Sequence, residues 1–414
     1  MTETDAFLGA AALFAYVLVA NTLNARGVTS PMAFAVYGWL LGPLGLGIVH
    51  LDIENSTIEQ IAIFTLVLTL MTDAVRIDVR KLRHRHAMPL RMLGIGLPLT
   101  VVAGAALAFL LFPALSLWEA VLLGIILAPT DAALGRQVVT DKKVPGRVRQ
   151  ALNVESGLND GLGLPLLLFA AWMASATGDM GGVGGWTLYL GEQLVLGPIV
   201  GLALGIGGAA TVGFARDRDW MTDDHLRLAV AGLALLTYTG AELAGGNGFI
   251  ATFFCGLVLA MRSPSLQRAA DDFEKSGGEL FNLTVFMLFG AVLLPEYLDH
   301  ITWRHLLFAV LALTALRMGP VALSLLGLGL MPATLAFVGW FGPRGMASII
   351  YLLILATRYD VPAINDLGAT IVLTVLVSIF AHGFSAGPLA RLYARHMDRR
   401  KGTESEPCPE FPSP

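Results

Sequence analysis

Long apolar runs alternate with short polar connections along almost the whole chain. Each run approaches the roughly 20 residues that an α-helix needs to cross a lipid bilayer. The pattern predicts an all-α integral membrane protein with thirteen transmembrane helices. The runs lie at about 6–23, 31–49, 57–75, 88–112, 116–135, 150–176, 186–214, 225–243, 247–261, 277–294, 304–329, 332–357 and 366–393.

The spacing of the runs predicts an internal repeat. The starts of runs 1 to 6 and of runs 8 to 13 differ by 216 to 220 residues, a nearly constant offset. Seven crossings separate the two halves, so the second half enters the membrane from the opposite face. The sequence therefore predicts two inverted six-helix repeats joined by run 7. Inverted repeats are typical of secondary transporters that work by alternating access.

Basic residues gather in the connections on one side of the predicted membrane domain. That side holds 23 of the 27 Lys and Arg residues, whereas the other side holds only Arg304 and Arg358. Arg317 and Arg344 fall within runs. Positive charge resists translocation, so we expect a multi-pass protein of the plasma (inner) membrane, with the N-terminus outside and the C-terminus cytoplasmic. The polar, proline-rich segment 397–414 is expected to be a disordered cytoplasmic tail.

Composition narrows the function classes. Hydrophobic residues make up 55% of the chain and charged residues 14%. Cys255 and Cys408 cannot form a disulfide framework or a zinc site. A membrane enzyme would need a nucleophile, a cofactor motif or a metal cluster, and a channel would need a continuous polar path or a filter-like ring. The sequence instead shows one local polar cluster, so no enzyme activity, cofactor or nucleic-acid partner is expected.

Runs 5 and 12 each contain a proline at matching positions, Pro129 and Pro343, which are 214 residues apart. Proline donates no backbone hydrogen bond and disfavours helix at the preceding residue, so helices 5 and 12 are predicted to be broken. The breaks would leave free carbonyls, which can take a cation, and helix ends whose partial charges Asp131 and Arg344 could neutralise. Alternatively, the prolines only kink two helices and Asp131 lies near an interface.

A cluster of polar residues, in the stretch NVESGLNDG, opens the apolar part of run 6. At about 100° per residue, Glu155, Ser156, Asn159 and Asp160 share one face of a helix. Ionisable groups are costly in lipid, so this face must point into the protein or a water-filled cavity. Cations such as Na⁺ prefer oxygen ligands. We therefore expect a Na⁺ site formed by Asp160, Glu155, Ser156 and Thr130.

Asp160 is the expected proton-exchanging group. A buried carboxylate can be neutralised by a proton or by a bound cation, so the two compete, and competition at an alternating-access site is antiport. Glu155 could bind the cation, or it could pair with Arg344 or Arg317 and hold helices together. Asn159 cannot titrate, and we expect it to orient Asp160 or to accept a hydrogen bond from an arginine.

Four segments resemble the NhaP-type sodium/proton antiporters of the monovalent cation:proton antiporter-1 family. They are TDAALG at 130–135, VPGRVRQALNVESGLNDG at 144–161, GNGFIATFFCGLVLA at 246–260 and GWFGPRGMASI at 339–349. The resemblance covers nearly all the runs, and the ESGLND and FGPRG segments are specific. The thirteen runs with breaks in the fifth and twelfth are also similar to that family.

The resemblance implies a homodimer. Residues 1–75 (runs 1 to 3) and 186–294 (linking run 7 and runs 8 to 10) would form a dimerisation scaffold, and residues 88–176 and 304–393 would form a moving transport core. It also implies electroneutral exchange of one Na⁺ or Li⁺ for one H⁺.

Motif by motif, the resemblance makes Asp160, Glu155, Ser156 and Thr130 the ion site, with Asn159 and Arg344 as supports. One departure is Ala132, where many members of that family have proline. A K⁺/H⁺ antiporter, or a carrier of another substrate on the same scaffold, fits the same residue pattern. A panel of cations separates these possibilities.

Overall fold

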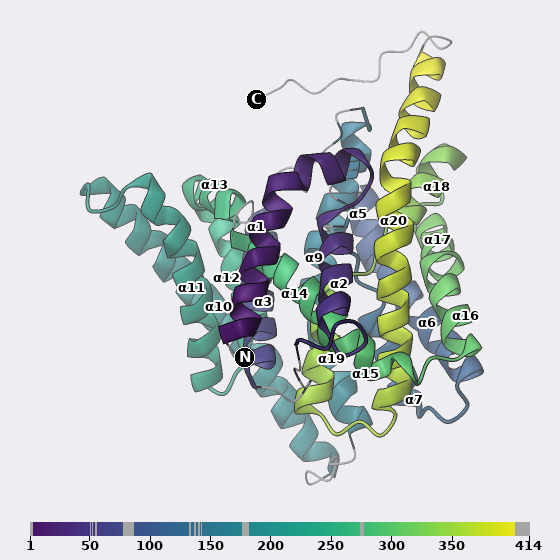
Figure 1. Ribbon diagram of the computed structural model, residues 1–414. Helices are drawn as coiled ribbons and strands as arrows, with labels where there is room; N and C mark the ends of the chain where they lie inside the picture. The colour runs from purple at the N-terminus through teal and green to yellow at the C-terminus, as the bar shows by residue number, and fades with distance from the viewer. Residues whose placement is uncertain are drawn as a thin grey trace.

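The computed structural model is built from helices, and it describes residues 3–49, 51, 53, 56–77, 87–131, 134, 135, 138, 139, 141, 143–175, 182–273 and 277–401. Every regular element within these residues is helical (Figure 1). The elements are α1 (Glu3–Ala25), α2 (Ser30–Leu41), α3 (Ser56–Val75), α5 (Ala87–Arg91), η1 (Met92–Gly96), α6 (Leu97–Leu111), α7 (Leu117–Ile126), α9 (Gly146–Ala174), α10 (Gly182–Asp217), α11 (Asp223–Leu243), α12 (Gly248–Arg262), α13 (Pro264–Phe273), α14 (Glu279–Leu288), η3 (Phe289–Leu293), α15 (Leu294–Leu298), α16 (Trp303–Leu313), α17 (Ala315–Ser324), α18 (Pro332–Trp340), α19 (Met346–Arg358) and α20 (Ile364–Lys401).

Within the described part of the chain, nine helices are long and apolar enough to cross a bilayer, and four more apolar helices are shorter. Each of the thirteen predicted runs overlaps one of these helices. The predicted all-helical membrane class is therefore confirmed. The number of crossings and the inverted repeat stay predictions.

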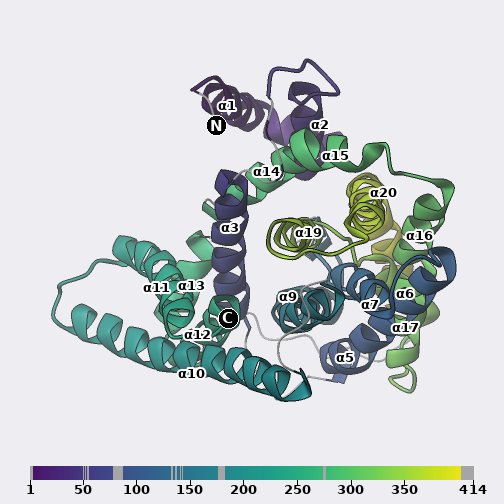
Figure 2. The same cartoon turned by 90° about the horizontal axis from the view of Figure 1, so that it is seen from below.

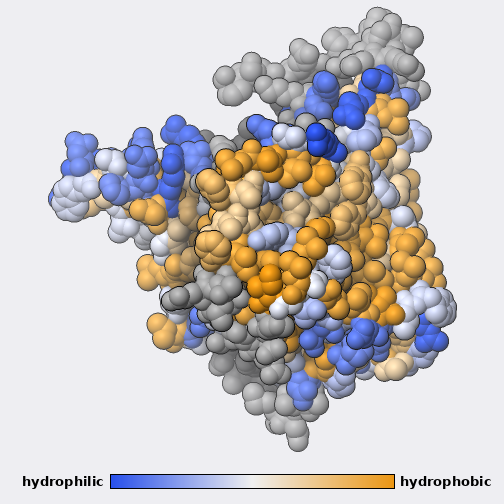
Figure 3. All heavy atoms as spheres, viewed as in Figure 1, coloured by the Kyte–Doolittle hydropathy of each residue, from blue (hydrophilic) through white to orange (hydrophobic). Residues whose placement is uncertain are grey.

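Hydrophobic side chains cover the middle of the face shown in Figure 3, and hydrophilic side chains gather toward its two ends. Among the exposed apolar residues are Phe14 and Leu18 of α1 and Val102 and Leu110 of α6. Exposed apolar side chains around a helical bundle whose backbone bonds are satisfied internally are what a bilayer requires. The surface therefore agrees with the membrane assignment.

Some helix boundaries differ from the sequence prediction. Run 2 was expected to reach residue 49, but α2 ends at Leu41 because Pro43 disfavours helix at Gly42, which is extended (φ −71°, ψ −177°). Run 11 was expected to be continuous, but the chain leaves helical geometry at Thr314 (φ −114°, ψ −92°), between α16 and α17.

The predicted disordered tail, 397–414, was placed too early. α20 continues through Lys401, so residues 397–401 are helical, and residues 402–414 lie outside the described part. The final turns contain no Gly or Pro, and basic side chains at a helix C-terminus interact favourably with the helix dipole.

α3 lies between two groups of helices (Figure 2). On one side, α11, α12 and α13 contact it, and α10 packs on α11 and α12. On the other side, α9 and α19 contact α3, and α6, α7, α16, α17 and α20 lie beyond them. α9, which carries the polar face identified in the sequence, is therefore surrounded by α3, α7, α12 and α19.

Candidate functional site

The polar face of α9 points into the protein. Glu155, Ser156, Asn159 and Asp160 are all buried, with exposed fractions of 3%, 8%, 1% and 6%. α9 is long, and its apolar C-terminal half follows this polar turn directly. Because polar groups inside a membrane domain need partners, the contacts of these four side chains decide what the site can do.

The helix break after α7 lies beside this face. α7 ends at Ile126, and residues 127–131 are not helical. Arg344, whose side chain is fully buried, donates through Nη1 to the carbonyl of Ala128 and, over 2.8 Å, to the carbonyl of Pro129. The sequence predicted free carbonyls at this break, but these two accept from Arg344. Ala132, the departure from the family pattern, lies outside the described residues.

The breaks of the two interrupted helices bind each other. The backbone N–H of Asp131 donates to the carbonyl of Pro343 over 2.8 Å. The carboxylate of Asp131 accepts from the backbone N–H of Met346, the first residue of α19, over 2.7 Å. Ser348 closes the contact by donating to the carbonyl of Ile126 over 2.8 Å. Asp131 thus neutralises the N-terminus of one half-helix, and Arg344 binds carbonyls at the C-terminal end of another, as helix dipoles favour.

Gly345 makes the Asp131 contact possible, since a Cβ there would overlap Asp131 Oδ2 and lie 2.7 Å from Leu134 Cδ1. We expect Gly345→Ala to lower the free energy of unfolding by about 2–4 kcal/mol, from overpacking and loss of the α19 cap. Thermal unfolding in detergent measures this. Gly319→Ala is the matched control, because a Cβ there meets nothing within 4 Å. Equal melting temperatures for the two variants would contradict the prediction.

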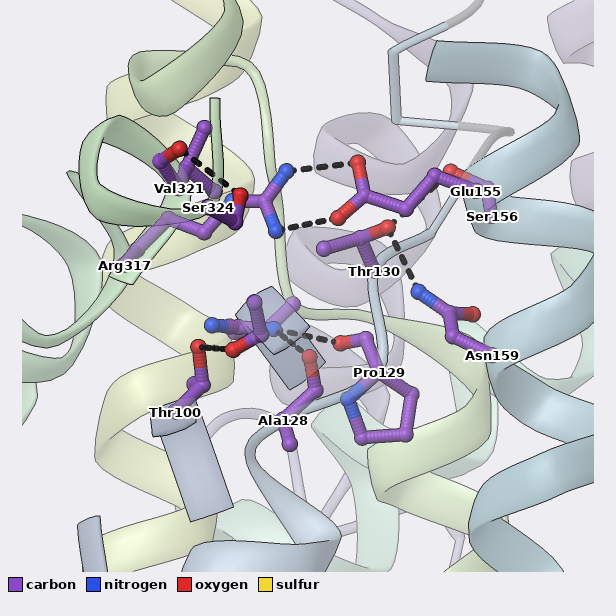
Figure 4. Close-up of polar contacts among 12 residues, drawn as sticks. Thr100, Ala128, Pro129, Thr130, Glu155, Ser156, Asn159, Arg317, Val321 and Ser324 are labelled. Carbon is purple, nitrogen blue, oxygen red and sulfur yellow. Dashed lines mark hydrogen bonds and ion pairs between the residues drawn. The ribbon is translucent and has the colours of Figure 1, made fainter. Parts of the chain in front are cut away.

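Glu155 pairs with Arg317 of α17. The two guanidinium Nη atoms donate to the two carboxylate oxygens, with 2.7 Å between Nη2 and Oε2 (Figure 4). Both side chains are only 4% exposed. Of the two arginines that the sequence offered to Glu155, Arg317 is the one that binds it. Gly342 leaves room for this guanidinium, because a Cβ there would overlap Arg317 Nε.

Asn159 and two hydroxyl groups form a second polar cluster. Asn159 Nδ2 donates to Thr130 Oγ1 over 2.8 Å, and Thr130 Oγ1 lies 3.1 Å from Ser156 Oγ (Figure 4). The expectation that Asn159 accepts from an arginine is wrong for this structure, since its Oδ1 has no hydrogen-bond partner among the described residues. Asn159 instead holds the side chain of Thr130, and this hydrogen bond joins the break after α7 to the polar face of α9.

Asp160 is a buried carboxylate on the polar face of α9. Its Oδ1 is buried and has no hydrogen-bond partner in the part of the chain that the structure describes. Its backbone carbonyl accepts from the hydroxyl of Tyr351 on α19, over 2.7 Å. A buried polar atom without a partner is costly and calls for an explanation. A proton or a cation bound to Asp160 would satisfy it.

The sequence prediction missed several residues that shape this site. Tyr351, Ser348, Ser378 and His382 all hydrogen-bond to the two breaks or to α9. Ser348 and Tyr351 are three residues apart, and Ser378 and His382 are four apart, so each pair shares one face of an otherwise apolar helix. This helical spacing of polar groups at membrane depth was the signal that could have found them.

Comparison with known proteins places these features in a family context. A family model described as sodium/hydrogen exchanger, transmembrane, matches residues 9–392. Na(+)/H(+) antiporter 2 of Zygosaccharomyces rouxii is 28% identical over 346 residues, which are 77% of this chain and 41% of that protein. The chain thus spans less than half the length of that relative. K(+)/H(+) antiporter NhaP2 of Shewanella baltica is 24% identical over 414 residues, covering 98% of this chain and 70% of that protein.

The fold is similar to a solved transporter structure. The sodium proton antiporter MjNhaP1 from Methanocaldococcus jannaschii, determined at pH 8, superposes with a TM-score of 0.75. The match covers 94% of this chain and 98% of that chain, at 22% sequence identity. At this identity the similarity shows a shared fold.

Proposed function

Because this chain belongs to the sodium/hydrogen exchanger family, we propose that it exchanges Na⁺ or Li⁺ for H⁺ across the plasma membrane, one for one and without net charge movement. It is a secondary transporter rather than an enzyme. The observation that carries the proposal is Asp160 Oδ1, which is buried on the polar face of α9 beside two interlocked helix breaks and has no hydrogen-bond partner among the described residues.

The proposed ion site uses Asp160 with the hydroxyls of Ser156 and Thr130. These are oxygen ligands, which alkali cations prefer, and Asn159 holds the Thr130 side chain in place. Glu155 remains part of the proposed site, since a carboxylate oxygen that accepts one bond from Arg317 keeps a further lone pair. Arg344 and Asp131 would support the site by neutralising the ends of the broken helices.

Coupling would follow from competition at one carboxylate. Asp160 can be neutralised by a proton or by a cation but not by both, so each departs before the other binds. Residues 88–176 and 304–393 would move as a transport core against a dimerisation scaffold formed by residues 1–75 and 186–294. The interlocked breaks support this division, because Asp131 and Arg344 tie the two halves of the core to each other.

A K⁺/H⁺ antiporter is the second candidate. The relative from Shewanella baltica, which aligns with 98% of this chain, is described as a K(+)/H(+) antiporter. The same oxygen ligands can take either cation, and selectivity depends on the size and rigidity of the site.

Reconstitution in liposomes with an imposed pH gradient tests the proposal. Added Na⁺ or Li⁺ should dissipate the gradient, and the rate should not change when equal K⁺ on both sides and valinomycin clamp the voltage. Dissipation by K⁺ alone would favour the second candidate. If no alkali cation dissipates the gradient faster than in protein-free liposomes, both candidates are wrong.

Competition also predicts a pH dependence. The apparent KM for Na⁺ should rise as the pH falls, approaching about tenfold per pH unit where the proton occupies most sites, because one proton displaces one cation. Initial exchange rates are measured across a series of pH values, and the rate in protein-free liposomes at the same pH is subtracted from each. A KM that is constant over the series would contradict a shared carboxylate.

A further inference from the structure

One turn of α20 is bonded to both sides of the break between α18 and α19. Ser378 and His382 lie four residues apart on α20 and are buried, with exposed fractions of 0% and 1%. The backbone N–H of Arg344 donates to Ser378 Oγ over 2.7 Å. His382 Nε2 lies 3.0 Å from the carbonyl of Trp340, the last residue of α18. The two side chains therefore span residues 340–344 from outside the broken helix.

His382 forms contacts through both of its ring nitrogens. Nε2 lies 3.0 Å from the carbonyl of Trp340, and Nδ1 lies 3.0 Å from the backbone carbonyl of Ser378 and 3.2 Å from the Ser378 hydroxyl. A carbonyl only accepts, so a ring nitrogen that bonds to it must hold a hydrogen. The imidazole thus links Trp340, at the end of α18, to Ser378, whose Oγ accepts from the backbone N–H of Arg344.

Trp340 also holds the end of α18 to α20 through its side chain. The indole of Trp340 lies against the imidazole, with ring centroids 5.1 Å apart. The same indole donates to Ser385 Oγ over 2.9 Å. The end of α18 is thereby held to α20 through both its side chain and its carbonyl.

We propose that His382 and Ser378 are positioning residues for cation exchange. Their bonds fix the path of residues 340–344, and this path sets where the Arg344 guanidinium meets the carbonyls of Ala128 and Pro129. Those carbonyls directly precede Thr130, so a displaced Arg344 shifts a proposed cation ligand. The inference rests on the proposed function, and it adds two residues of α20 that do not touch the cation.

The test compares four variants in the liposome assay, using the cation that the wild-type protein exchanges. His382→Phe keeps a ring but loses both bonds, whereas His382→Gln keeps an amide donor that can reach the Trp340 carbonyl. Ser378→Ala removes the acceptor for Arg344. Thr374→Ala is the matched control, since the Thr374 hydroxyl is equally buried one turn earlier on α20 and bonds only within that helix.

We expect Ser378→Ala to raise the apparent KM for the cation about tenfold, the effect of one lost hydrogen bond, and His382→Phe to raise it at least as much. His382→Gln should restore it to within about threefold of wild type, and Thr374→Ala should leave it unchanged. Melting temperatures in detergent are measured alongside. If His382→Phe does not fold, Ser378→Ala against Thr374→Ala decides the question.

The outcomes separate this inference from the proposed function. Wild-type protein that exchanges cations, with variants that lose only melting temperature or maximal rate at unchanged KM, would assign the α20 bonds to stability alone and overturn the inference. Wild-type protein that exchanges no cation would overturn the proposed function itself.

Discussion

Asp160→Asn is expected to abolish cation-dependent proton movement while the protein stays folded. Asparagine has nearly the same shape as aspartate, but it can neither lose a proton nor neutralise a cation. The hydrogen bond from the Tyr351 hydroxyl goes to the backbone carbonyl of Asp160, so it survives the substitution. We therefore expect exchange to fall to the rate of protein-free liposomes, with a change in the free energy of unfolding below about 1 kcal/mol.

The matched control for Asp160→Asn is Glu119→Gln. Glu119 is also a buried carboxylate, with an exposed fraction of 4%, and it lies at the other end of α7. Its oxygens accept from the backbone N–H groups of Ser116 and Ala363, a role that a Gln oxygen can partly keep. This variant should retain exchange with an unaltered KM. Full exchange by Asp160→Asn would remove Asp160 from the ion site.

The helix breaks and the polar face of α9 could be predicted from the sequence because they depend on chemistry that acts locally. Pro129 and Pro343 disfavour helix at the residues that precede them and lie at matching places in the two halves, so breaks there could be predicted without tertiary information. The face formed by Glu155 and Asp160 followed from helical periodicity, because buried polar groups at that spacing must share a direction. Both features depend on a few neighbouring residues, and both stand in the structure where the sequence placed them.

The pairing of groups from distant helices could not be predicted in the same way. Glu155 and Arg317 are 162 residues apart, and the choice of Arg317 over Arg344 depends on how α17 approaches α9. The interruption at Thr314 has no proline or glycine to mark it, so tertiary packing overrides local preference there. The capture of two break carbonyls by Arg344 is likewise a consequence of two helices crossing. Such contacts are properties of the assembled fold.

Breaking the Glu155–Arg317 pair is expected to have the largest effect on stability. Glu155→Gln leaves a guanidinium buried without a compensating charge, which costs about 3–5 kcal/mol. Arg317→Gln should cost a similar amount by leaving the carboxylate unpaired. The double variant Glu155→Gln/Arg317→Gln removes both charges, so it should recover much of the loss, giving a large coupling in a double-mutant cycle. Melting temperatures in detergent measure all three.

The exposed pair Arg358–Glu59 is the matched control for this cycle. Its Nε–Oε1 distance is 2.8 Å, but the side chains are 36% and 29% exposed. Solvent screens such a pair, so Glu59→Gln should cost less than about 1 kcal/mol. If Glu155→Gln and Glu59→Gln lowered the free energy of unfolding equally, the prediction would be wrong, because the unpaired Arg317 guanidinium would then cost no more than an exposed one.

The double variant also decides the role of Glu155 in transport. If Glu155 only anchors α9 to α17, then Glu155→Gln/Arg317→Gln should exchange cations with a near wild-type KM once its stability is recovered. If Glu155 is a cation ligand, the double variant should fold but lose cation affinity, since a neutral amide oxygen binds a hard cation more weakly than a carboxylate. The two carboxylate oxygens accept from the two guanidinium nitrogens of Arg317, as the anchoring role requires. Asp160, whose Oδ1 is free among the described residues, would then be the single titrating ligand that one-for-one exchange requires.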